Sequence, residues 1–248
     1  MSNNIDKLIE ESLLFLKKER ELFGDFSIKQ PSELSPSNSG TEHGDPANTD
    51  QATGKKSVAK PEDCQTLEQL RELCESADEL RTDLEGTNLV FGTGNPDANL
   101  MLIGEAPGYH ENKQGEPFVG NAGQLLNKIL KAIKFNREDV YIANILKHRP
   151  PDNRDPKPEE RARSLPYLIR QIELVDPKLI LCLGRISATT LLKRDESLRD
   201  MRGKFHPFMG RQLMVTYHPA ALLHHPEWKR PTWEDVQLLK TRYDELVG

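Results

Sequence analysis

The sequence predicts an α/β fold, a three-layer α/β/α sandwich around a four-stranded, mostly parallel sheet. Two observations support it. Four short apolar runs alternate with helical patterns along the C-terminal two-thirds of the chain. Each run is apolar throughout, which is typical of strands covered on both faces, whereas a half-exposed strand alternates apolar and polar residues. Strands that alternate with helices favour a parallel sheet with helices on both sides.

The N-terminal third is different. Residues 1–24 contain an amphipathic helical pattern formed by Ile5, Leu8, Ile9, Leu13 and Leu16. Residues 25–62 are rich in Ser, Pro, Gly, Asn and Asp. Such a segment buries too little apolar surface to offset its chain entropy, so we expect a disordered linker there. The folded domain is therefore expected at 63–248.

The first helix of this domain is expected to begin at Thr66, which forms a capping-box pattern with Gln69. One face of this predicted helix carries the apolar residues Leu67, Leu70, Leu73, Cys74, Ala77 and Leu80. The pattern therefore predicts a helix that extends to Leu80.

The strands are expected at "LMLIG" (100–104), "VYIANIL" (140–146), "LILCLG" (179–184) and "QLMVTY" (212–217). Helical patterns lie near 122–134, 158–175, 185–193 and 232–247. Pro158 followed by two glutamates suits a first helical turn, since proline fits there and acids favour a helix N-terminus. Thr232 is the expected N-cap of the last helix.

Composition limits the class of protein. The net charge is −5, but residues 1–84 hold 10 Lys or Arg and 18 Asp or Glu, so the remainder is mildly basic and permits a nucleic-acid partner.

No apolar run approaches the roughly 20 residues that span a bilayer, and no secretory pattern is visible. Three cysteines do not make a disulfide framework. We expect a cytoplasmic, monomeric protein without a membrane partner.

In an open parallel sheet, ligands bind beyond the carboxyl ends of the strands. Glu105 follows the first expected strand, Asn144 lies near the end of the second, and His218 follows the fourth. The motif "GEAPG" matches neither common phosphate-binding glycine motif, and "HHPEW" lacks the spacing of a zinc site. An ATPase or a nicotinamide-dependent enzyme is therefore not expected.

Four ordered motifs carry a family resemblance: "GEAPG", "GEPFVGNAGQLL", "YIANILKHRPPDNRDPKP" and "HPAALL". Over residues 85–248 the sequence resembles the uracil-DNA glycosylases of the family 4 type. The resemblance implies hydrolysis of the N-glycosidic bond of deoxyuridine in DNA, after the base has been flipped out of the helix. Uracil-containing DNA is the implied partner, and a replication or repair protein could dock on the N-terminal helix.

The resemblance also implies the site. It gives catalytic roles to Glu105 and His218, and it places Gly104, Ala106, Gly108, Phe118 and Asn144 around the base. Phe118 would stack on uracil, and the Asn144 amide would pair with its N3–H and O4. His218 would donate to O2, and Glu105 would orient or activate water or offset positive charge on the sugar. Lys147, Arg149, Lys229 and Arg230 are expected phosphate contacts, and Leu222 and Leu223 are expected to enter the base stack.

Many members of that family hold a four-iron, four-sulfur cluster on four cysteines. The corresponding positions here are Cys74, Ala77, His148 and Ser164. Because such clusters need thiolate ligands, we expect no metal and no other cofactor. A different class of function stays open for the same reason: a catalytically weak DNA- or nucleotide-binding module that has kept the glycosylase fold.

Overall fold

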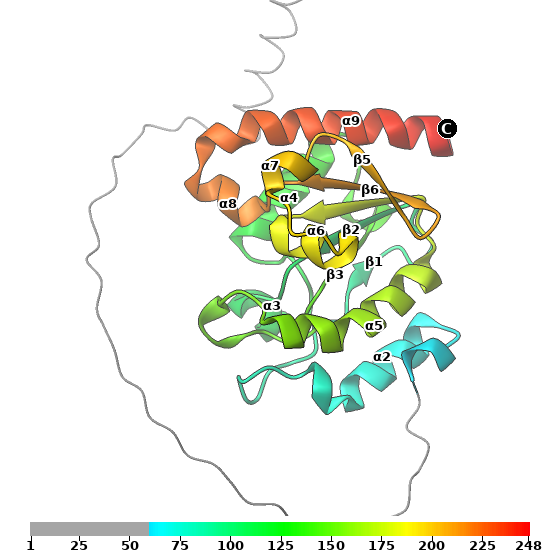
Figure 1. Cartoon of the computed structure of the whole chain (residues 1–248), viewed down its shortest axis with the longest axis vertical. Helices are drawn as coiled ribbons and strands as arrows, with labels where there is room; N and C mark the ends of the chain where they lie inside the picture. The colour runs from blue at the N-terminus through cyan, green and yellow to red at the C-terminus, as the bar shows by residue number, and fades with distance from the viewer. Residues whose placement is uncertain (1–59) are drawn as a thin grey trace, which may run out of the picture.

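The computed structural model describes residues 60–248 (Figure 1). The predicted helix at 1–24 and the predicted linker at 25–62, except its last three residues, lie outside the described residues. Within 60–248 the strands form a single mixed sheet with the order β1-β3-β2-β4-β6-β5. They are β1 (Thr93–Gly94), β2 (Leu100–Gly104), β3 (Tyr141–Asn144), β4 (Leu179–Leu183), β5 (Phe205–Phe208) and β6 (Arg211–Thr216).

The four strands expected from the sequence form the centre of this sheet, and all of their pairings are parallel. The expected strand count was too low, because β1 and β5 add antiparallel edges. Neither edge strand has a long apolar run: β1 contains two residues, and β5 contains His206 and Pro207. Short strands and proline are common at sheet edges, where they hinder pairing with other chains.

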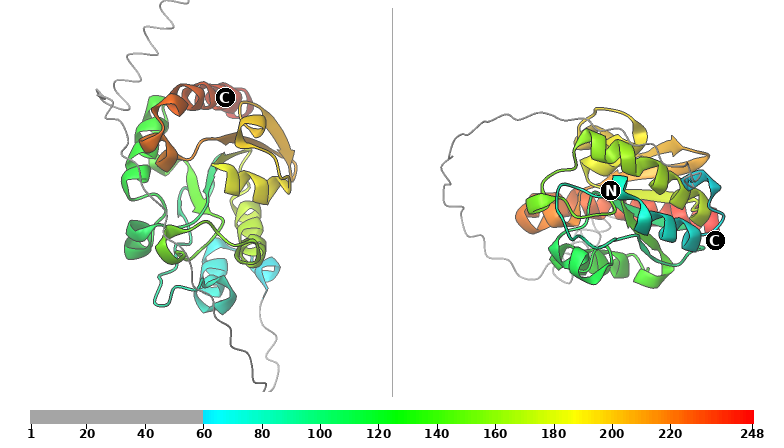
Figure 2. Two further views of the ribbon diagram at one scale, coloured as in Figure 1. Left: turned by 60° about the vertical axis from the view of Figure 1, so that its left-hand side comes forward. Right: turned by 90° about the horizontal axis from the view of Figure 1, so that it is seen from below.

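Helices cover both faces of the sheet. One face packs against α4 (Asn121–Ala132), α8 (Pro219–His224) and α9 (Lys229–Val247). The other packs against α5 (Pro158–Val175), α6 (Arg185–Leu192) and α7 (Leu198–Met201). Residues of β2 alternate between the faces, with Leu102 in the first core and Ile103 in the second. The left view of Figure 2 shows α4 and α5 on opposite sides of the strands.

Helix α2 (Leu67–Ser76) lies outside α5 (Figure 1). The two helices form a third apolar cluster, in which Cys74 and Tyr167 are buried. The side chain of Thr66 accepts the Gln69 N–H at 3.2 Å, which confirms the expected N-cap. The helix ends earlier than expected, because the backbone becomes extended at Ala77. Leu80 reaches the same cluster from a separate 3₁₀ turn, η2 (Asp78–Leu80).

The central helices match their predicted positions within a few residues, but α9 begins at Lys229, before Thr232. The Thr232 hydroxyl donates to the Trp228 carbonyl at 2.8 Å, so this residue lies within the helix and is not its cap. The shorter elements had no strong sequence pattern: α3 (Tyr109–Gln114), η1 (Pro61–Asp63), η3 (Arg137–Asp139), η4 (Pro151–Asn153) and η5 (Pro226–Trp228). Within 60–248, no helix combines the length and the apolar character that crossing a membrane requires.

Candidate functional site

A cavity of about 330 Å³ opens at the carboxyl ends of the parallel strands. Parallel register places the ends of β2 and β3 side by side, with Gly104 opposite Asn144. The cavity is lined by Glu105, Ala106, Pro107, Gly108, Glu111, Phe118, Ala122, Asn144, Pro150, Asn153, Arg154, His218 and Ala220. The structure therefore brings six of the seven expected catalytic and base-contacting residues to one cavity, and the seventh, Gly104, lies against two of them.

The Asn144 side chain is buried at the end of β3, and its Oδ1 atom has no hydrogen-bond partner among residues 60–248. A Cβ atom at position 104 would lie 2.3 Å from Oδ1, so only glycine leaves room for this amide. Leaving a buried acceptor unpaired costs about 1–3 kcal/mol. The cost disappears when a ligand supplies a donor, which makes Asn144 the best candidate for direct recognition.

Phe118 forms the aromatic side of the cavity. Its ring is buried and lies 5.4 Å from the His218 ring, centroid to centroid, at an interplanar angle of 34°. A Cβ atom at Gly104 would approach Phe118 Cζ to 2.6 Å, so the same glycine makes room for the ring. The backbone of Phe118 is left-handed, with φ +53°, which is uncommon for a bulky residue.

His218 is the N-cap residue of α8. Its Nδ1 atom accepts the Ala220 N–H at 3.2 Å, so in the neutral ring the proton is on Nε2. Burial lowers the pKa of His218 to about 4, although the charge of Glu111 opposes the shift. The ring is therefore a neutral donor at physiological pH. Gly184, with φ +95°, approaches closely: a Cβ there would lie 3.1 Å from the His218 Cβ.

Glu105 follows β2 and is half-buried at the edge of the cavity. Burial raises the pKa of its carboxyl to about 7; the charge of Asp155 raises it further, and Arg161 lowers it. A carboxyl that titrates near neutral pH can accept a proton effectively at the operating pH.

Sequence reasoning did not assign roles to several residues that line the cavity, among them Glu111, Pro150, Asn153 and Arg154. The last three belong to the loop after β3, inside a motif that carried the family resemblance. Glu111 lies on α3, a short helix without apolar periodicity. A signal for all four was available, since each is close in sequence to a residue that was assigned.

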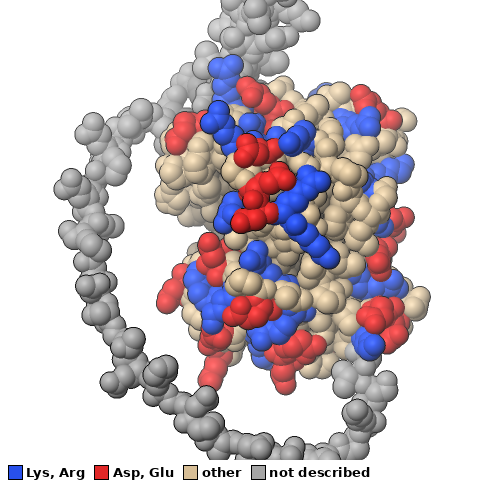
Figure 3. Space-filling model, viewed as in Figure 1, with Lys and Arg blue, Asp and Glu red and all other residues tan. Residues whose placement is uncertain are grey.

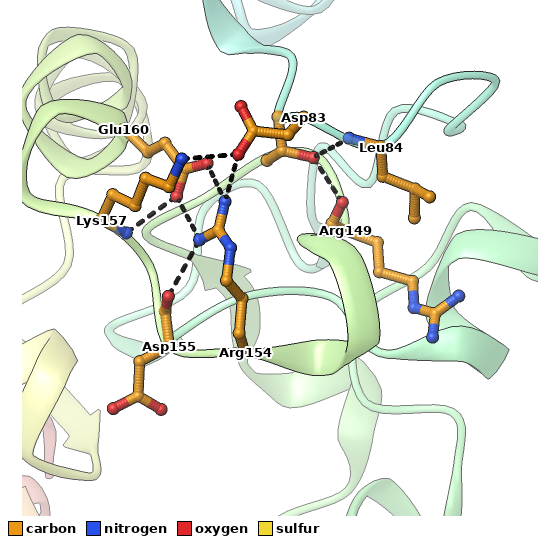
Figure 4. A network of polar contacts seen from close by, with 8 residues as sticks. Asp83, Leu84, Arg149, Arg154, Asp155, Lys157 and Glu160 are labelled. Atoms are coloured by element: carbon orange, nitrogen blue, oxygen red, sulfur yellow. Dashed lines mark hydrogen bonds and ion pairs between the residues drawn. The ribbon is translucent and has the colours of Figure 1, made fainter. Parts of the chain in front are cut away.

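A network of ion pairs holds the loop after β3 in place (Figure 4). The Arg154 guanidinium donates to both carboxylate oxygens of Glu160, at 2.9 and 2.6 Å, and to Asp83 at 3.1 Å. Lys157 also donates to Asp83, at 2.6 Å. The Arg154 hydrogen bond holds the pKa of Glu160 below its usual range. The network joins the loop to the segment that precedes β1.

The structure corrects three of the expected DNA contacts. Lys147 is 0% exposed and donates to the carbonyls of Asn144 and Phe91 and to the Gln171 amide oxygen. Lys229 is 5% exposed, and Leu222 is 1% exposed in the core under α8. A buried side chain reaches neither a phosphate nor a base step, so the expected contacts of these three residues are wrong.

The other three expected DNA contacts remain at the surface. Leu223 is 45% exposed, next to buried Leu222. Arg149 is partly exposed, donates to Asn153 Oδ1 at 2.8 Å and lies over the Tyr109 ring at 5.4 Å. Arg230 is exposed and forms an ion pair with Glu234 at 3.3 Å. Figure 3 shows basic and acidic side chains interspersed on the viewed face, with no broad basic patch there.

Sequence comparison gives the family. The model of the uracil DNA glycosylase superfamily matches residues 91–238. The chain belongs to this superfamily. It is similar to three proteins named Type-4 uracil-DNA glycosylase. The protein from Archaeoglobus fulgidus is 43% identical over 170 residues, which cover 65% of this chain and 83% of that protein. The protein from Saccharolobus solfataricus is 45% identical over 162 residues (62% and 75%), and that from Pyrobaculum aerophilum is 41% identical over 182 residues (69% and 92%).

The positions at which the resemblance implies cluster ligands are Cys74, Ala77, His148 and Ser164. Cys74 is the one thiol among them, and burial raises the pKa of this thiol to about 12. His148 Nδ1 is hydrogen-bonded to the Thr87 hydroxyl at 3.0 Å, and the Ser164 hydroxyl donates to the Ile145 carbonyl at 2.6 Å. In the described residues, no group of three or more His, Cys, Asp or Glu side chains is arranged to hold a metal ion.

Proposed function

We propose that this chain is a monofunctional uracil-DNA glycosylase, which hydrolyses the N-glycosidic bond of deoxyuridine in DNA and leaves an abasic site. The main support is the unpartnered Asn144 Oδ1 atom in a cavity that also contains an aromatic ring and a neutral imidazole. The relatives named Type-4 uracil-DNA glycosylase support the same activity.

Asn144 supplies the recognition. Its Oδ1 accepts a hydrogen bond from uracil N3–H, which pairs the buried acceptor, and its amide N–H donates to O4. With the amide in this orientation, cytosine, which has an acceptor at N3 and a donor at N4, forms neither bond and leaves the Asn144 acceptor unpaired. Phe118 provides a ring on which the extrahelical base stacks, a contact worth about 1–3 kcal/mol per base.

His218 stabilises the leaving group. When the bond between C1′ and N1 breaks, the electron pair stays on the base, and part of the negative charge is on O2. The His218 Nε2–H donates to O2, because Nδ1 is already occupied by the Ala220 N–H. A pre-organised donor of this kind contributes about 3–4 kcal/mol. Because the ring is neutral, it stabilises the uracil anion by hydrogen bonding and does not transfer a proton to it.

Glu105 acts on the water. Water forms a bond to C1′ of the sugar cation and loses a proton, which the Glu105 carboxylate accepts. The same carboxylate lowers the energy of the positive sugar. At the surface, Leu223, Arg149 and Arg230 remain the candidates for contacts with the DNA around the flipped nucleotide.

We also propose that the chain folds and acts without an iron–sulfur cluster, since the Cys74, Ala77, His148 and Ser164 positions offer one thiol. The full-length protein, purified without oxygen, should contain no stoichiometric iron and show no visible absorbance band. Dialysis against a chelator should leave its uracil release unchanged. Stoichiometric iron together with activity lost on chelation would contradict this proposal.

Uracil release from a single-stranded oligonucleotide and from a U:G duplex tests the function. The intact chain should release free uracil and leave an alkali-labile site, and His218→Ala should slow the single-turnover rate at least about tenfold. If the chain binds the oligonucleotides but uracil stays attached, it is the DNA-binding module considered as the alternative.

A further inference from the structure

The four residues Pro117 to Gly120, here called the aromatic loop, carry Phe118 into the cavity. Phe118 has a left-handed backbone, a conformation that persists in a bulky residue only when its surroundings enforce it. The loop contains no secondary structure of its own before α4 begins at Asn121. Groups outside the loop must therefore hold its backbone in this conformation.

Two side chains of opposite charge hold the loop from outside it. The Glu111 Oε1 atom accepts the N–H groups of Val119 and Gly120, both at 2.9 Å. The Arg137 guanidinium donates to the carbonyl of Phe118 at 3.2 Å and to the carbonyl of Pro117. Together the two side chains bind one backbone group of each of the four loop residues.

The Arg137 side chain also ties the loop to the rest of the site. It lies in η3, just before β3, the strand that ends at Asn144. It donates to the Asn127 side chain on α4 at 3.2 Å. Burial lowers the pKa of its guanidinium, and the charges of Glu116 and Glu111 oppose that shift. The same side chain thus reaches the aromatic loop, α4 and the segment that leads into β3.

Glycine makes the close approach possible. A Cβ atom at Gly123 on α4 would lie 1.8 Å from the Phe118 carbonyl oxygen, and one at Gly104 would lie 2.6 Å from Phe118 Cζ. The Phe118 ring therefore lies against the end of β2, and its backbone lies against the start of α4. Glu111 and Arg137 hold the loop in this position.

We propose that Glu111 and Arg137 are positioning residues, which fix Phe118 in advance as the stacking surface for the extrahelical base. This inference rests on the proposed glycosylase activity and deepens it. Neither side chain needs to touch the reacting atoms. Because the two side chains order the loop before DNA binds, the free-energy cost of ordering it does not weaken binding of the base.

The test compares four full-length variants by single-turnover uracil release. Glu111→Ala and Arg137→Ala should each lower the single-turnover rate constant about tenfold, because a displaced ring stacks poorly. Glu111→Gln keeps an amide oxygen that accepts the two N–H groups and should recover most of the loss. Glu116→Ala removes an exposed carboxylate from the same region, whereas the loop N–H groups of Val119 and Gly120 bind Glu111. This control should stay within about twofold of the natural chain.

Coupling to Phe118 separates positioning from a general effect on folding. In a Phe118→Ala background, Glu111→Ala should cost less than about twofold, since there is no ring left to position. Hydrogen exchange of the Val119 and Gly120 amides should accelerate in Glu111→Ala and stay slow in Glu116→Ala. Full additivity of the two substitutions, or unchanged exchange, would overturn the inference. If the natural chain releases no uracil, the proposed function fails, while the exchange measurement still tests the hold on the loop.

Discussion

Asn144 and Lys147 lie three residues apart at the end of β3, and both are fully buried. Their side chains differ in whether they have hydrogen-bond partners in the protein. Lys147 has three acceptors: the carbonyls of Asn144 and Phe91, at 3.1 and 3.3 Å, and the Gln171 amide oxygen at 2.7 Å. The Asn144 amide oxygen has no hydrogen-bond donor within residues 60–248. The Lys147 side chain points toward the apolar cluster of α2 and α5, here called the α2–α5 side, and the Asn144 side chain points into the cavity.

The difference separates two uses of a buried polar group. A satisfied group stabilises the fold, because its partners would otherwise be left unpaired. An unsatisfied group reduces stability and keeps its hydrogen bond for a ligand. The α2–α5 side is built from satisfied pairs, such as Thr87 with His148 and Ser164 with the Ile145 carbonyl. Substitutions on that side should therefore change stability, and those at the cavity should change activity.

The largest expected effect is at the cavity. Asn144→Ala should lower the single-turnover rate of uracil release by about 10²–10³-fold, as loss of a pre-organised hydrogen-bonding group does elsewhere. The melting temperature should not fall, because the removed oxygen has no partner among the described residues. Gln124→Ala, on the exposed side of α4, removes a similar amide and should leave the rate unchanged. A large drop in melting temperature for Asn144→Ala would contradict the distinction between residues that support stability and residues that support activity.

The next largest effect is on the satisfied side. Lys147→Met should lower the free energy of unfolding by about 2 kcal/mol at pH 7, since the Asn144 carbonyl and the Gln171 amide lose a donor. Chemical denaturation measures this change. Burial lowers the pKa of Lys147 to about 8, so above that pH the unfolded chain binds the additional proton. The natural chain should therefore gain stability relative to Lys147→Met as pH rises from about 8 to 10. Equal stability at all pH values would contradict the prediction.

Glu105 should show a smaller effect with a pH signature. The rate of the natural chain should rise as pH increases through about 7, where the Glu105 carboxyl loses its proton. Glu105→Gln should be about tenfold slower at pH 8 and should lack this rise. The raised pKa means that the folded chain holds the proton longer, so stability falls as pH rises from about 4.5 to 7. In Glu105→Gln, the stability measured by thermal unfolding should lack the part of this fall that Glu105 causes. The exposed control Glu116→Gln should keep the pH dependence of both the rate and the stability.

The smallest expected effect is at Thr87. Thr87→Val removes the hydroxyl that bonds His148 Nδ1 and should lower the free energy of unfolding by about 1 kcal/mol. Uracil release should be unaffected, since the pair lies away from the cavity lining. Thr189→Val, on the half-exposed surface of α6, is the matched control and should stay within about 0.5 kcal/mol. A loss of activity in Thr87→Val would show that the two sides are coupled.

Local pattern predicted the centre of the fold well and its margins poorly. The β2 and β4 strands and the α5 helix have continuous apolar runs or strong periodicity, and they lie where expected. Edge strands such as β5 lack that signal, because an edge strand is partly exposed to solvent and does not need to be apolar along its whole length. Helix α8 has six residues, too few for periodicity to show that Leu222 faces the core and Leu223 faces solvent.

The order of apolar and polar residues along the chain was enough to place Glu105, Asn144 and His218 at one edge of a layered α/β domain, because parallel strands end on the same side. Only tertiary structure decided that Lys147 is buried, that Asn144 lacks a partner within residues 60–248, and that Glu111 and Arg137 hold the aromatic loop. Each of those facts depends on which distant segments meet a side chain. Burial and hydrogen-bond pairing are properties of such contacts, and the local sequence does not contain them.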